Sequence, residues 1–108
     1  MERALSELGA RIREWTVYMR DLAVSQRLAA DMTHYEYLAD NRVIIEELAQ
    51  KLGQAPFKLE THIAHDVAAL DHRLMARWAS GAFIWSPVWT PAYPPEVYWW
   101  LYGHPQAD

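Results

Sequence analysis

The chain has 108 residues, the size of one ordinary domain, and 52% of them are hydrophobic, which is enough for a single packed core. The formal net charge is −4, so the chain has no overall positive field that would attract a nucleic acid. The absence of cysteine excludes disulfide frameworks, thiolate zinc sites, iron–sulfur clusters and cysteine nucleophiles.

The N-terminal segment has the strongest periodic pattern in the chain. Apolar residues recur there at alternating spacings of three and four, at Leu5, Leu8, Ile12, Trp15, Met19 and Leu22. This spacing is that of a coiled-coil seam, so we expect a helix over about residues 2–31 and a homodimer interface along this stripe. Charged residues interrupt the segment, unlike a signal peptide, and no stretch approaches the roughly 18 apolar residues of a membrane span. We therefore expect a soluble, cytoplasmic domain that does not contact a membrane.

A second helix is predicted over residues 34–52. Thr33 and Glu36 have the spacing of a capping box, and Gly53 is a natural C-terminal stop. The apolar positions of this helix are Tyr35, Leu38, Ile44, Ile45, Leu48 and Leu52. An alternative joins this segment to the first helix, because no proline or glycine separates the two.

The segment from residue 45 to 63 resembles the start of a helix-turn-helix. Ala49 and Gly53 are four residues apart, which permits a tight crossing of two helices. However, Gln54 follows the glycine where an apolar residue is usual, and only Lys51 and Lys58 are available for phosphate contacts. We favour an ordinary helical hairpin, and keep a small DNA-binding regulator as the alternative function.

A third helix is predicted over residues 58–80, after Pro56 and before Gly81. Its apolar stripe consists of Leu59, Ile63, Val67, Leu70, Leu74 and Trp78. The opposite side carries Ala68, Ala69, Ala76 and Ala79, together with His65 and His72. A second helix could approach these small residues closely, so this side is a further candidate for the subunit interface.

The same helix carries the candidate metal ligands His62, His65 and Asp66. His62 and Asp66 have the i, i+4 spacing that lets two side chains share a metal ion, whereas His65 points to the other side of the helix. One monomer cannot gather all of them, so we expect no metal and no other cofactor. A metal-dependent enzyme with a histidine site at a dimer interface is the second alternative. The chain has neither a nucleophile elbow nor a phosphate-binding glycine loop, which argues against an enzyme.

Residues 82–108 form a compositionally distinct arm. Five of the six prolines lie there, together with eight of the chain's aromatic residues, and Glu96 is the only formally charged residue between Ala79 and Ala107. The prolines predict an extended path, followed by a short helix from Glu96 to about Leu101. Such an arm either completes the core of the helices or presents a docking surface, because tryptophan and tyrosine are enriched at binding hot spots.

We therefore predict an all-α protein: a three-helix antiparallel bundle over residues 1–81 with a Pro/aromatic-rich C-terminal arm ending in a short helix. The favoured function is a non-catalytic protein–protein interaction module, acting as an adaptor, assembly factor or inhibitor. We expect a protein partner and a homodimer, and no nucleic acid. The predicted partner-binding residues are Trp85, Trp89, Tyr93, Trp99 and Trp100.

Overall fold

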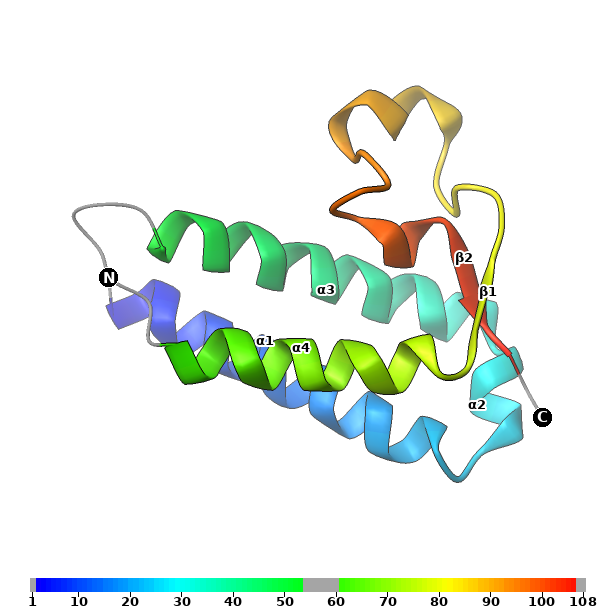
Figure 1. The fold of residues 1–108 in the computed structure, drawn as a ribbon, viewed down its shortest axis with the longest axis horizontal. Coiled ribbons are helices and arrows are strands. Elements are labelled where there is room, and N and C mark those ends of the chain that lie inside the picture. The colour runs from blue at the N-terminus through cyan, green and yellow to red at the C-terminus, as the bar shows by residue number, and fades with distance from the viewer. Residues whose placement is uncertain (1, 54–60, 107–108) are drawn as a thin grey trace.

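The body of the protein consists of three long helices. A computed structural model describes residues 2–53 and 61–106, and its long helices are α1 (Glu2–Leu22), α3 (Met32–Leu52) and α4 (Thr61–Met75). Figure 1 shows α1 and α4 running in one direction and α3 in the other, which confirms the predicted antiparallel bundle. None of the described helices is long and apolar enough to cross a membrane.

The first helix is shorter than predicted, because the chain turns after Leu22 and starts the short helix α2 (Gln26–Ala30). The Ser25 hydroxyl accepts a hydrogen bond from the backbone N–H of Leu28 at 3.1 Å, which is the contact of an N-cap. A capping side chain of this kind satisfies backbone donors that a continuous helix would have satisfied. The prediction of one helix to residue 31 was therefore wrong.

The start of α3 also differs from the expected capping box. Asp31 has an extended backbone conformation, and its carboxylate accepts from the backbone N–H of His34 at 3.0 Å. The cap thus lies two residues before Thr33, because the Asp31 carboxylate is a strong acceptor placed where the chain leaves α2. The predicted break before the second helix is confirmed, and so is its end at Leu52.

The third helix ends at Met75, five residues before its predicted end. Residues Trp78–Ser80 form the strand β1 instead, which pairs antiparallel with β2 (Gly103–Pro105). This pairing satisfies the backbone of residues far apart in sequence, and so it overrides the local helical pattern. The helix was predicted to start at residue 58, after Pro56, and both positions lie outside the described residues.

The arm between the two strands is fixed to the bundle. It contains two 3₁₀ helices, η1 (Pro87–Ala92) and η2 (Trp99–Leu101), so the expected short helix is a single 3₁₀ turn. Backbone hydrogen bonds from Gly81 N–H to the Tyr102 carbonyl and from Ile84 N–H to the Leu101 carbonyl continue the pairing beyond the strands, each at 2.8 Å. Figure 1 shows η2 beside α3 and η1 farther from the helices.

The core lies between the three helices and includes the inner part of the arm. The helices contribute apolar side chains from their facing stripes, and η2 contributes two more. The buried apolar residues are Leu8, Trp15, Tyr18, Met19, Leu22, Tyr35, Leu38, Ala39, Val43, Ile45, Leu52, Val67, Leu70, Leu74, Trp100 and Leu101. The arm is therefore part of the same hydrophobic core as the bundle.

The β1–β2 pairing depends on a glycine at position 103. Gly103 has a φ of +152°, and an added Cβ would overlap the Ala79 carbonyl oxygen and lie 2.8 Å from Cζ2 of Trp78. We expect Gly103→Ala to lower the free energy of unfolding by about 1–3 kcal/mol, measured by urea denaturation. Gly81→Ala is the matched control, because its Cβ would come no closer than 3.8 Å to Gly103 Cα. Equal stability of the two variants would contradict this explanation.

Candidate functional site

The five aromatic residues predicted to bind a partner divide into two groups. Trp100 is 0% exposed, and its indole N–H donates to the Ala39 carbonyl at 3.1 Å. Its own carbonyl accepts from the hydroxyl of Tyr35, and burial raises the pKa of that hydroxyl, which keeps it protonated as a donor. Trp99 is half-buried, with its ring edge-on to Trp78 at 5.3 Å. Trp100 therefore has no surface left for a partner, which corrects its predicted role.

The second group lines a cleft between the arm and α3. Trp85, Trp89 and Tyr93 form its wall together with Ser86 and Asp40 of α3, around a volume of about 430 Å³. Trp89 is 57% exposed, whereas Trp85 and Tyr93 are half-buried. Three of the five predicted residues are thus gathered in one place, and Asp40 is the member that sequence analysis missed. We call this site the arm cleft.

The local structure of the arm holds the backbone of the arm cleft and two of its three rings. Pro87 and Pro91 restrict the backbone of η1, and the Trp89 N–H donates to the Ser86 carbonyl at 3.0 Å. The Trp85 and Tyr93 rings meet edge to face, with centroids 5.1 Å apart and an interplanar angle of 83°. The Tyr102 hydroxyl also donates to the Tyr93 carbonyl at 2.6 Å. The backbone of the cleft and the Trp85 and Tyr93 rings are therefore preformed.

The surroundings of the arm cleft are acidic. Asp40 is exposed and, among the residues that the structure describes, forms no ion pair. Farther along α3, Glu47 and Glu46 lie close enough to the arm to raise the pKa of Tyr98, adding to the larger effect of burial. The arm itself carries no lysine or arginine between Ala79 and Ala107. The one charged side chain among the described residues that line the cleft is the Asp40 carboxylate, which attracts a cation.

A buried charged network lies beneath the arm and joins all three helices. The carboxylate of Asp71 in α4 accepts from Arg42 Nε at 3.0 Å and from Arg42 Nη2 at 2.8 Å. The indole N–H of Trp15 in α1 donates to the same carboxylate at 3.0 Å. Arg42 also contacts Glu46 at 3.4 Å, and its guanidinium lies 4.2 Å from the ring centroid of Trp100. Every charge in this network has a partner, so the network is structural.

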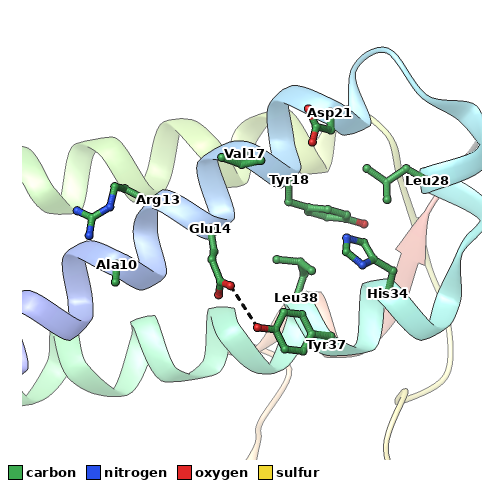
Figure 2. Close-up of a pocket in the computed structure, with 10 residues that line it drawn as sticks. All are labelled: Ala10, Arg13, Glu14, Val17, Tyr18, Asp21, Leu28, His34, Tyr37 and Leu38. Atoms are coloured by element: carbon green, nitrogen blue, oxygen red, sulfur yellow. Dashed lines mark hydrogen bonds between the residues drawn. The ribbon is translucent and has the colours of Figure 1, made fainter.

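A second groove lies between α1, α2 and α3 (Figure 2). It encloses about 490 Å³, and its wall includes Tyr18, Tyr37 and His34, with a hydrogen bond of 3.2 Å from the Tyr37 hydroxyl to Glu14. The Tyr18 hydroxyl is buried and has no hydrogen-bond partner among the described residues, and burial raises its pKa. The rest of the lining has charges of both signs, from Arg13, Glu14 and Asp21. This groove therefore favours neither a cation nor an anion.

The seam predicted as an oligomer interface is mostly part of the chain's own core. Four of its residues are buried in the monomer: Leu8, Trp15, Met19 and Leu22. Ile12 is half-buried against the core, and only Leu5 is exposed. The stripe packs inside the chain because α3 supplies the facing apolar surface that a second subunit was expected to supply. The predicted intermolecular seam is thus corrected to an intramolecular one.

The candidate metal ligands do not form a site within the described part of the chain. His62, His65 and Asp66 are all exposed on α4. Within residues 2–53 and 61–106, no group of three or more histidine and carboxylate side chains could hold a metal ion.

The segment that resembles a helix-turn-helix belongs to two antiparallel neighbours of the bundle. Figure 1 shows α3 and α4 running in opposite directions, and the connection at residues 54–60 lies outside the described residues. Lys51 is exposed at the end of α3, and Lys58 falls in the undescribed connection. A scan against protein-family models and searches of curated proteins and of solved structures found no match to this chain.

Proposed function

We propose that this protein is a non-catalytic interaction module, an adaptor, assembly factor or inhibitor, that binds a protein partner through the arm cleft. The observation that carries the proposal is the exposure of Trp89 on an arm whose two ends are fixed to the bundle. Because the backbone that carries Trp89 is already ordered, only the side chain has to lose conformational entropy when a partner covers it. Trp85 and Tyr93 then form the more buried part of the same surface.

A second copy of the chain is one form that this partner can take. The α4 side with exposed Ala68, Ala69 and Ala76 offers small residues for a close helix–helix contact, which supports a homodimer. Light scattering on a sizing column measures the mass of the full chain. A dimer that stays dimeric on Trp89→Ala would have its interface outside the arm cleft, as on this side of α4, whereas one that becomes monomeric would have it at the arm cleft. In that case, the partner sought is the protein itself.

Partner capture with matched variants tests the proposal. The full chain, its Trp89→Ala variant and its Val24→Ala variant are used as baits, since Val24 is exposed in the turn between α1 and α2. We expect a partner that is retained by the wild type and by Val24→Ala but is lost with Trp89→Ala. Urea denaturation of the three baits should give the same midpoint, because both substituted side chains are mainly exposed. An identical set of captured proteins for all three baits would contradict the proposal.

A further inference from the structure

The protein contains one completed example of a guanidinium held by tryptophan and aspartate. The guanidinium of Arg42 lies 4.2 Å from the ring centroid of Trp100, and Asp71 takes two of its N–H groups at 3.0 Å and 2.8 Å. The ring face attracts the cation, while the carboxylate satisfies donors along the edge of the guanidinium plane. An arginine side chain that binds in this way has its positive charge against a ring face and its N–H donors paired with a carboxylate at the same time.

The arm cleft presents the same kinds of groups on the surface without a cation. Trp85, Trp89 and Tyr93 supply aromatic rings, and Asp40 supplies the carboxylate. None of the residues lining this cleft is a lysine, arginine or histidine, and Asp40 has no ion-pair partner within the described ranges. The volume of about 430 Å³ lies within the range of roughly 300–1,000 Å³ typical of ligand sites.

We propose that the arm cleft binds the guanidinium of an arginine side chain in the partner protein, an inference that rests on the proposed interaction function. Charge complementarity supports this occupant, because the cleft has one carboxylate and the arm has no cation of its own. Arginine matches better than lysine, because a planar guanidinium stacks on an indole and keeps its edge free for a carboxylate. The acidic residues of α3, including Glu47, add to the attraction at longer range.

Peptide titration of the full chain tests this assignment. The indole N–H signals of Trp85 and Trp89 are followed by nuclear magnetic resonance as a capped pentapeptide with a central arginine and flanking glycines is added. The same peptide with lysine, or with neutral citrulline, serves for comparison. We expect both indole signals to shift, and the citrulline peptide to bind at least about fivefold more weakly, since it loses both the cation–π contact and the ion pair.

Matched protein variants identify the groups responsible. Asp40→Asn should weaken arginine-peptide binding by about twofold to fivefold, the range of an exposed ion pair. Trp89→Ala should weaken it at least as much. Asp66→Asn makes the same change in net charge on the exposed side of α4 and should leave the affinity unchanged.

Several outcomes would overturn the arginine assignment. Equal binding of the arginine, lysine and citrulline peptides would do so, as would an unchanged affinity in Asp40→Asn. The absence of any indole shift up to about 10 mM peptide, which populates even a complex with a Kd of about 1 mM, would also do so. If partner capture nevertheless depends on Trp89, the interaction function stands and only the arginine assignment fails. If capture does not depend on Trp89, both proposals fail.

Discussion

The Trp100→Ala variant is expected to lose about 3–5 kcal/mol of its free energy of unfolding. The side chain is 0% exposed, so truncation leaves a large cavity between α3 and the arm. The substitution also removes the hydrogen bond to the Ala39 carbonyl and the aromatic face beneath the Arg42 guanidinium. Because domains of this size are stable by about 5–15 kcal/mol, the loss is a large part of the total. Urea denaturation followed by circular dichroism measures it.

Two variants control this prediction. Trp89→Ala removes the same side chain from the exposed part of the arm and is expected to change the free energy of unfolding by less than about 0.5 kcal/mol. Trp100→Phe keeps an aromatic ring but loses the indole donor, so its stability should lie between that of Trp100→Ala and the wild type. A Trp100→Ala protein as stable as Trp89→Ala would show that the arm does not contribute to the core.

The Asp71→Ala variant is expected to lose about 3–5 kcal/mol, because it leaves the Arg42 guanidinium buried without its main carboxylate partner. Arg42 is 5% exposed and cannot recover these contacts from water. Glu46 remains at 3.4 Å from Arg42, but it meets a different nitrogen of the guanidinium. The indole N–H of Trp15 loses its acceptor as well. The measurement is again the urea midpoint, compared with that of the wild type.

A double variant separates two contributions to the free energy of unfolding. One is the destabilisation by a buried unpaired charge, and the other is the stabilisation by the ion pair itself. Arg42→Met combined with Asp71→Leu removes both charges and fills the space with apolar side chains, so it should recover most of the stability lost by Asp71→Ala. Asp66→Asn is the surface control on the same helix and should remain within about 0.5 kcal/mol of the wild type. A loss of less than about 1 kcal/mol in Asp71→Ala would contradict the view that this charge network joins the helices.

The buried ion pair has a signal in the sequence that the analysis of the sequence did not use. Arg42 lies between Leu38 and Ile45 at spacings of four and three, so it occupies a position on the apolar seam of α3. Asp71 lies between the buried residues Val67 and Leu74 at the same spacings of four and three, so it occupies a position on the apolar seam of α4. A charged residue on an apolar seam predicts a buried partner of opposite charge. The sequence does not identify that partner, because the pairing depends on how α3 and α4 are placed side by side.

The arm cleft could be predicted only in part. The density of Trp85, Trp89 and Tyr93, without cations, already indicated a binding surface. Asp40 could not be added to them, because it lies 45 residues before Trp85 and joins the cleft only when the arm folds back over α3. From its neighbours in the sequence, Asp40 is predicted only to be an exposed residue of a helix.

The three long helices and their apolar stripes follow from local sequence pattern, because helix formation depends on residues three and four positions apart. The turn capped by Ser25 ends α1 nine residues before the predicted end, and the Asp31 cap starts α3 two residues before its predicted start. The strand at residues 78–80 depends on tertiary folding, because its hydrogen-bond partners lie at residues 103–105. Tertiary folding brings these two segments together. It also decided which tryptophans of the arm are buried, since Trp100 and Trp89 differ in what covers them and not in their chemistry. Burial is a property of contacts between distant segments, and those contacts divide the arm into a part that holds the fold and a part that remains free to bind.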